Sequence, residues 1–209
     1  MAEDSTARRP RVDAQRNREL LLQAAREAFA DARAAGTGTG TGTGAGQPVT
    51  LDQVARRAGV GIGTLYRHFP SREALVEALY REEVEQLCAR AETLLAAHRP
   101  DVALRMWMDS FADYVEAKQE MGDALRALID TGVVTAAKSR ERLARALRHL
   151  LEAGAADGTL RPDLRAEDLV TAIVGVVSAT AIAGGREQLG RLFDLVLDGA
   201  RNHAGEPRT

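Results

Sequence analysis

A chain of 209 residues, rich in alanine, leucine and arginine and only 4% aromatic, favours helices over sheets and can bury a core without disulfides or metal ions. Its single cysteine excludes an internal disulfide and predicts a reducing cytoplasm, and no apolar stretch is long enough for a signal peptide or a membrane span. The net charge of −2 is uneven, because residues 1–72 hold 11 basic and 7 acidic side chains while the remainder is acidic; this distribution is typical of phosphate binding at one end, with chance as the alternative.

The first quarter of the chain predicts a disordered basic arm at residues 1–10, a helix at Asp13–Ala34 and a loop. The helix is indicated by an apolar stripe near the helical period, formed by Leu21, Leu22, Ala25, Ala28 and Phe29. Glycine alternates with threonine over residues 36–46, and glycine is strongly disfavoured inside helices. We therefore expect a flexible surface loop there.

Two short helices follow, at residues 51–58 and 62–68. Thr50 and Gln53 have the spacing of a capping box, in which each side chain binds a backbone N–H of the other residue. Gly59 lies where the chain must turn, and glycine adopts the left-handed conformation at little cost. The spacing predicts two helices that meet at a sharp angle.

The rest of the chain predicts further helices and no sheet. Ser71 is expected to cap a long helix that ends near His98, and Pro100 breaks the chain. Turn residues at positions 158–164 indicate a loop before the last two helices, and residues 204–209 read as a tail. The fold class is therefore all-α, with later helices expected at Asp101–Lys118, Gly122–Asp130, Thr135–Gly154, Ala166–Ala183 and Arg186–Asn202.

The segment at residues 50–69, with the sequence TLDQVARRAGVGIGTLYRHF, indicates a helix-turn-helix motif. Val54, Val60 and Leu65 would meet in the corner between its helices, and the small Ala55 lets the backbones approach. The second helix would then stand clear of the fold, able to enter a major groove. An ordinary helical hairpin uses the same packing, but the capping box and the basic N-terminal end favour the motif.

The N-terminal part of the chain resembles the DNA-binding domain of the TetR family of transcriptional regulators. The run AGVGIGTLYRHFPSREAL, at residues 58–75, matches the hallmark of that family almost position for position. The resemblance implies a three-helix DNA-binding domain at residues 11–70, followed by a helical regulatory and dimerisation domain at residues 71–203.

The resemblance also implies which residues contact DNA. Those expected at phosphates are Thr50, Tyr66, His68 and Arg72, and those expected to face the groove are Gly61, Ile62, Gly63, Thr64 and Arg67. Only side chains that reach a base edge read sequence, and arginine pairs bidentately with guanine. Arg67 is therefore the main candidate for direct readout, while Thr64 or Ile62 would touch a thymine methyl group.

Two features depart from the family pattern. Family members often carry a polar or basic residue at the position of Ile62, so readout here has few candidates and DNA shape would contribute. The glycine-threonine loop also adds about 12 residues where the family has a short turn, and loop insertions cost little stability. We expect the fold to tolerate this loop, with a role in DNA contact as the alternative.

The resemblance assigns the C-terminal helices to a homodimer interface and a ligand pocket. Apolar stripes on the last two helices predict that the interface includes Ile173, Val177, Leu189, Leu192, Phe193 and Val196; the core of a monomer is the alternative. Aromatic and methionine side chains predict a pocket for a small, largely hydrophobic effector, with an ordinary packed core as the alternative; its lining would be Trp107, Met108, Phe111, Tyr114, Met121, Leu125 and Ile129.

No enzyme motif is present. The four histidines lack metal-ligand spacing, and no nucleophile elbow or phosphate loop occurs, so neither a catalytic site nor a cofactor or metal is expected. The resemblance implies a cytoplasmic repressor that binds a palindromic operator and is released by an effector. A small-molecule carrier with an inactive head and a transcriptional activator are the alternatives; the effector, the operator and the regulated genes do not follow from the sequence.

Overall fold

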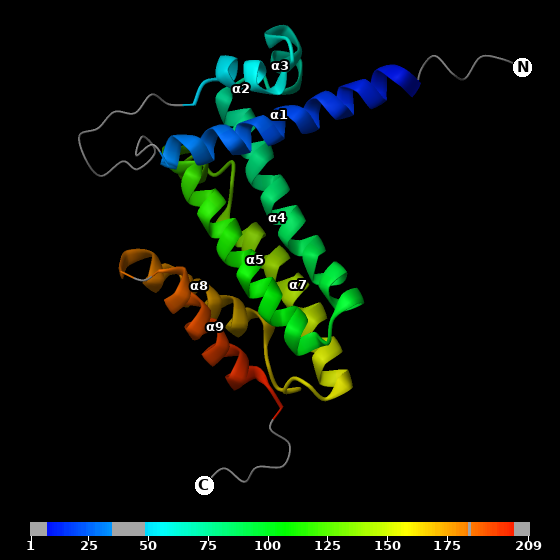
Figure 1. Ribbon diagram of the computed structural model, residues 1–209, viewed down its shortest axis with the longest axis vertical. Helices are drawn as coiled ribbons and strands as arrows, with labels where there is room; N and C mark the ends of the chain where they lie inside the picture. The colour runs from blue at the N-terminus through cyan, green and yellow to red at the C-terminus, as the bar shows by residue number, and fades with distance from the viewer. Residues whose placement is uncertain (1–7, 35–48, 184, 203–209) are drawn as a thin grey trace, which may run out of the picture. The chain divides into compact units, whose positions relative to one another are not determined.

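The computed structural model describes residues 8–34, 49–183 and 185–202, which form nine helices and no strand beyond one isolated bridge between Leu160 and Arg201 (Figure 1). The predicted all-α class is confirmed. The helices are α1 (Arg8–Ala34), α2 (Leu51–Ala58), α3 (Ile62–His68), α4 (Arg72–Ala97), α5 (Pro100–Glu120), α6 (Gly122–Asp130), α7 (Ala136–Asp157), α8 (Ala166–Ala183) and α9 (Arg186–Ala200).

Helix α1 begins at Arg8, five residues before the predicted start, so Arg8–Pro10 of the expected arm are helical. Proline is tolerated in the first turn of a helix because the N–H groups there have no intrahelical acceptor. The predicted stripe is present, with Leu21, Leu22, Ala25 and Phe29 buried and Ala28 half-buried. Residues 1–7, the glycine-threonine loop and the predicted tail lie outside the described residues.

The chain forms two compact units, and the division falls inside α4 and α5. The N-terminal unit comprises residues up to Glu82 together with 117–134, and the C-terminal unit comprises residues 83–116 and those from Thr135 onward. The boundary expected at residue 70 therefore lies within the N-terminal unit. A reason is visible at the start of α4, where Arg72 donates a hydrogen bond to the Val49 carbonyl (2.9 Å) and its guanidinium lies 5.8 Å from the centre of the Phe29 ring.

The C-terminal unit is a helical bundle in which α8 packs on both α7 and α9. Its largest fully buried side chains include Trp107 of α5 and Phe193 of α9. After α7 the chain turns back so that the Leu160 side chain lies directly against Gly154, where any side chain in place of the glycine would collide with it. Small residues at such positions let the loop lie directly against the helix.

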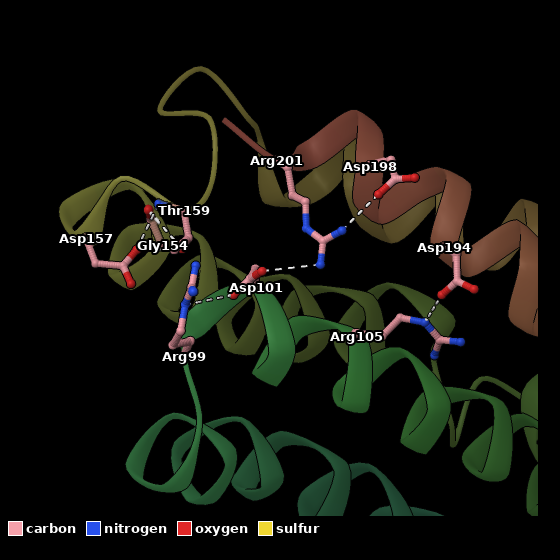
Figure 2. A network of polar contacts seen from close by, with 9 residues as sticks. All are labelled: Arg99, Asp101, Arg105, Gly154, Asp157, Thr159, Asp194, Asp198 and Arg201. Carbon is pink, nitrogen blue, oxygen red and sulfur yellow. Dashed lines mark hydrogen bonds and ion pairs between the residues drawn. The ribbon is translucent and has the colours of Figure 1, made fainter. Parts of the chain in front are cut away.

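A polar network joins the end of α9 to the start of α5 (Figure 2). The buried carboxylate of Asp101 lies 3.3 Å from the Arg201 guanidinium and 3.6 Å from that of Arg99. In the same region the backbone N–H of Asn202 donates to the Thr159 carbonyl (3.0 Å). These contacts hold the last residues of α9 against elements that are distant in the sequence.

Candidate nucleic-acid interface

Helix α2 begins with the predicted capping box. The Thr50 hydroxyl accepts a hydrogen bond from the Gln53 backbone N–H (3.3 Å), and the Gln53 side chain accepts one from the Thr50 N–H (3.0 Å). Gly59 ends the helix at φ 64° and ψ 25°, in the left-handed region. Both ends of α2 are thus fixed by the residues that the sequence identifies.

The corner between α2 and α3 is built from small and branched apolar side chains. Val54 and Leu65 are completely buried, Ala55 is buried, and Val60 is half-buried. The Val60 N–H donates to the Ala55 carbonyl at 3.0 Å, which closes the turn. The face of α3 that carries Leu65 is therefore buried against α2, and the opposite face of α3 is exposed to solvent.

The solvent-facing side of α3 holds most of the residues predicted to contact DNA. Ile62 is 40% exposed and Tyr66 is 52% exposed, although both are large side chains. The remaining predicted residues of this face are the exposed Gly61, Gly63 and Arg67 and the half-buried Thr64 and His68. This surface, which we call the α3 face, carries the aliphatic side chain of Ile62, the hydroxyl groups of Thr64 and Tyr66, the Arg67 guanidinium and the His68 imidazole.

Residues around α3 hold it in place. Arg72 is half-buried and anchored to Val49, so its guanidinium also positions the start of α4 beside the motif. The guanidinium of Arg18, on α1, lies 5.1 Å from the centre of the Phe69 ring, a cation–π contact directly after α3. The sequence pattern does not single out Arg18, because it lies more than 30 residues before the motif.

Two further arginines of α2 are engaged in ion pairs. Arg56 pairs with Asp52 and Arg57 pairs with Asp31 of α1, each at 2.5 Å. Both pairs are largely solvent-exposed, so they contribute little to stability. Their acidic partners nevertheless reduce the net positive charge that α2 presents to solvent.

The residues predicted for a dimer interface divide into two groups. Ile173, Val177, Leu189 and Phe193 are buried inside the C-terminal unit, with Ile173 and Phe193 at 0% exposure. Leu192 and Val196 are half-buried, and Leu195 between them is 68% exposed. Burial of the first four within a single chain favours the core alternative for those positions, whereas Leu192 and Val196 stay candidates for the predicted interface.

The aromatic residues predicted to line a pocket form a packed cluster in the C-terminal unit. The ring centres of Trp107 and Phe111 are 5.9 Å apart, and those of Phe111 and Tyr114 are 5.7 Å apart; Met108 is buried with them. The Trp107 indole N–H donates to the Leu87 carbonyl at 2.9 Å. The other three predicted lining residues, Met121, Leu125 and Ile129, belong to the N-terminal unit, where the first two are buried and the third is half-buried.

An open groove of about 560 Å³ lies elsewhere in the C-terminal unit, between α4 and α7. Small residues, including Cys88 and Ala146, leave the space between the helices, and charged residues border it. Burial raises the pKa of the Cys88 thiol, and the positive charge of Arg142 acts in the opposite direction. None of the predicted pocket residues lines this groove, which the sequence does not reveal because its walls lie about 60 residues apart.

A capped helix, a left-handed turn and a second helix with one buried and one solvent-facing side define a helix-turn-helix protein, a class that binds DNA through the major groove. In the described part of the chain, no group of three or more histidine, cysteine, aspartate or glutamate side chains is arranged to hold a metal ion. Among the same residues, no helix is long and apolar enough to cross a membrane.

Comparison with known proteins gives the family. Residues 47–79 match the family described as bacterial regulatory proteins, tetR family, and residues 99–202 match the C-terminal domain of SbtR-like transcriptional regulators. The crystal structure of the TetR transcriptional regulator SCO0520 from Streptomyces coelicolor is 42% identical and aligns over 89% of this chain and 99% of that one, with a TM-score of 0.73. A TetR regulator from Mycobacterium vanbaalenii is 32% identical over 91% of this chain and 98% of its own, with a TM-score of 0.65. The chain belongs to the TetR family of transcriptional regulators and is not an enzyme.

Curated relatives are more distant or match over shorter segments. The HTH-type transcriptional repressor KstR2 of Mycolicibacterium smegmatis is 28% identical over 153 residues, which cover 70% of this chain and 69% of the relative. The HTH-type transcriptional regulator SAR0097 of Staphylococcus aureus is 41% identical over 46 residues, which cover 22% of this chain and only 24% of that protein. The second match is therefore confined to a short segment.

Proposed function

We propose that this regulator is a cytoplasmic repressor that binds a palindromic DNA operator as a homodimer and is released by a small, largely hydrophobic effector. The observation that carries the proposal is the α3 face, which exposes Ile62, Tyr66 and Arg67 on a helix whose opposite side is buried by Leu65. A helix held in this way has the shape and the chemical groups that major-groove recognition needs.

Contacts to DNA divide by chemistry. Hydroxyl and basic groups suit phosphates, and the proposed phosphate contacts are Thr50, Tyr66, His68 and Arg72. The proposed groove contacts are Gly61, Ile62, Gly63, Thr64 and Arg67. Arg72 donates its Nε–H to the Val49 carbonyl (2.9 Å), and a guanidinium carries four further N–H donors of the kind that a phosphate accepts.

The proposed dimer surface lies on the side of α8 and α9 that the unit itself does not cover. Leu195 is exposed and Leu192 and Val196 are half-buried on α9, while α8 exposes Ala172 and Gly175. Small residues on one helix and aliphatic side chains on the next suit close packing against the same helices of a second copy. A dimer places two α3 helices on one duplex, where half-sites are about 34–36 Å apart.

The proposed effector acts on the C-terminal unit. A ligand that binds one arrangement of the dimer more tightly than another lowers operator affinity by its differential affinity and no more. The cluster around Trp107 offers an apolar site if its side chains part, and the α4–α7 groove offers a more polar one. Because Trp107 is the only tryptophan, its fluorescence reports ligands that enter the cluster.

Selection from a random-sequence DNA library tests the function. The full-length protein should enrich a palindromic duplex, bind it in a salt-dependent manner, and repress a reporter whose promoter overlaps that duplex. Enrichment of no sequence would support the carrier alternative, and increased reporter expression would support the activator. A Tyr66→Ala, Arg67→Ala double variant is the control, because it alters the α3 face without touching the buried corner.

A further inference from the structure

The open groove between α4 and α7 lies within the C-terminal unit and takes no part in the proposed DNA contacts. Its volume of about 560 Å³ is in the range of sites that hold small-molecule ligands. Of the small residues that line it, Ala91 is buried, and Cys88 and Ala146 are half-buried. These side chains leave room for an organic body between two helices whose other lining residues are charged or polar.

The wall of the groove that α7 forms carries a basic stripe. Arg142, Arg145 and His149 are separated by three and four residues, so they lie on one face of the helix. Both guanidinium groups act on the Cys88 thiol: burial raises the pKa of the thiol above its ordinary value, whereas the positive charges of Arg142 and Arg145 act to lower it. Glu85, on the opposite wall, raises the same pKa. Two cations and one anion therefore act at this point of the groove.

The two arginines are only loosely paired within the chain. Arg142 lies 3.4 Å from Glu85, and Arg145 lies 3.4 Å from Glu141, whereas well-formed charged hydrogen bonds are about 2.7–2.9 Å long. The side chains of the two glutamates are 75% and 73% exposed, and ion pairs of this kind contribute little to stability. A ligand with two oxygens on one anionic group matches the planar donors of a guanidinium and can displace these glutamates at little cost.

The charge of the groove changes along its length. Glu92 of α4 and Glu152 of α7 also line it, seven residues or about 10 Å beyond Glu85 and Arg145 along their helices. Arg148 lies near this end, but its charge is already balanced by an acidic partner on α8 at 2.7 Å. The groove is therefore basic near its first turn of α7 and acidic further along, which favours a ligand with one anionic group over a ligand with an anionic group at each end.

We propose that the α4–α7 groove binds an organic anion, whose single carboxylate or phosphate group is held by Arg142 and Arg145 and whose apolar body lies over Cys88. The site is separate from the aromatic cluster around Trp107, none of whose residues lines the groove. The inference goes beyond the proposed repressor function and does not depend on it, because binding in the groove is measured without DNA.

Protection of Cys88 from alkylation tests the site, because the chain has a single cysteine and that cysteine lines the groove. Octanoate and octyl phosphate are the anionic probes, and octanol and octylamine provide the same chain without an anion. At least one anionic probe should slow the reaction of Cys88 with iodoacetamide in a saturable manner, and the anion that protects better identifies the group that the arginines prefer. Octanedioate should protect more weakly than octanoate, because its second carboxylate would lie near Glu92 and Glu152. Protection by neither anion, or equal protection by octanol, would overturn the proposal.

Substitutions of the arginines test which residues hold the anion. Arg142→Gln and Arg145→Gln should each raise the probe concentration for half-maximal protection by about tenfold, as for one lost charge-assisted hydrogen bond. Each variant is compared with its own rate without probe, because a changed charge also alters the thiol pKa. Glu85→Gln should lower the same concentration, because it removes the carboxylate that competes for Arg142.

Arg140→Gln is the matched control, since Arg140 is an exposed arginine of α7 that does not line the groove. Its half-maximal concentration should equal that of the wild type, and circular dichroism should show that every variant keeps its helices. If the control weakens protection as much as Arg142→Gln and Arg145→Gln do, or if those two variants bind as well as the wild type, the assignment is wrong. Selection of an operator from random DNA is a separate measurement, so either result leaves the proposed repressor function to its own test.

Discussion

At the scale of single residues, neighbouring side chains of α3 differ in what they can recognise. Tyr66 presents a hydroxyl, which suits a phosphate that is the same in every sequence, whereas Arg67 presents the planar donor pair that matches guanine. Both side chains are exposed, so substituting either one should change the free energy of unfolding little, and stability measurements do not separate their roles. Only binding measurements across operator variants separate the two roles.

Arg67→Ala should relax discrimination at one or two positions of each half-site, by about 1–3 kcal/mol for a bidentate pair. Tyr66→Phe should instead weaken binding about equally for all sequences, because a phosphate contact carries no base information. Titration of a panel of single-base operator variants measures both effects. If Arg67→Ala lowers every affinity by the same factor, its proposed role as a base reader is wrong.

Cys88 should react slowly with iodoacetamide at neutral pH, because burial raises its thiol pKa and only the thiolate is nucleophilic. Two nearby charges act on that pKa in opposite directions: Arg142 lowers it and Glu85 raises it. Arg142→Ala should therefore shift the pH profile of alkylation upward, and Glu85→Gln should shift it downward. Profiles that move in the same direction for both variants would contradict this electrostatic account.

At the scale of the elements, short helices depend on their ends. Helix α2 has only eight residues, so its capping box and its left-handed C-terminal glycine satisfy a large share of its backbone groups. At the end of α9 a short polar network adds to the buried apolar face of that helix. Stability at these sites is concentrated in a few identifiable contacts.

Thr50→Ala should lower the free energy of unfolding by about 1 kcal/mol, the usual cost of losing an N-terminal cap. Urea denaturation of the full-length protein measures the change. Thr50→Ser retains the hydroxyl and serves as the matched control, with an expected change close to zero. An unchanged stability for Thr50→Ala would mean that the two capping hydrogen bonds contribute nothing beyond those made with water.

Asp101→Ala should destabilise the C-terminal unit by about 1–3 kcal/mol, because Arg201 loses a partly buried partner. Hydrogen exchange should also increase at the Asn202 N–H, which bonds to Thr159 in the same region. Arg99→Ala is the control: Arg99 is mostly exposed, so its loss should cost no more than about 1 kcal/mol. Equal effects for the two variants would show that burial of Asp101 does not matter.

At the scale of the whole molecule, the proposed assembly depends on one exposed apolar surface. Leu195 lies on α9 at 68% exposure between the half-buried Leu192 and Val196, and contiguous apolar side chains of this kind are typical of a surface that a partner chain covers. Val177, by contrast, is buried within its own unit. The two positions therefore predict different consequences for the same substitution.

Leu195→Arg should yield a folded monomer whose operator affinity falls by about 100-fold, because two half-sites are no longer bound as one. Analytical ultracentrifugation and operator titration on the same sample measure both properties. Met106→Arg is the control, since Met106 is an exposed apolar residue of α5 outside the proposed surface. Val177→Arg should instead unfold the C-terminal unit. A Leu195→Arg variant that remains dimeric would place the interface elsewhere.

The sequence by itself determined the helical class, most helix boundaries and the motif. Local rules were sufficient for these features: the box at Thr50, the left-handed turn at Gly59 and the periodic apolar stripe of α1 all depend on residues a few positions apart. Helix α1 begins earlier than the sequence predicts. Pro10 lies in its first turn, where proline is tolerated, and proline breaks a helix only in the interior.

Only the tertiary structure decided which apolar residues face inward and which remain exposed. An apolar stripe shows that a helix buries one side, but not whether its own unit covers every apolar residue: Ile173 is buried by its own unit, whereas Leu195 is exposed. Contacts between distant segments, such as Arg18 with Phe69 and Asp101 with Arg201, also require the fold, because no sequence pattern encodes a spacing of 50 or 100 residues.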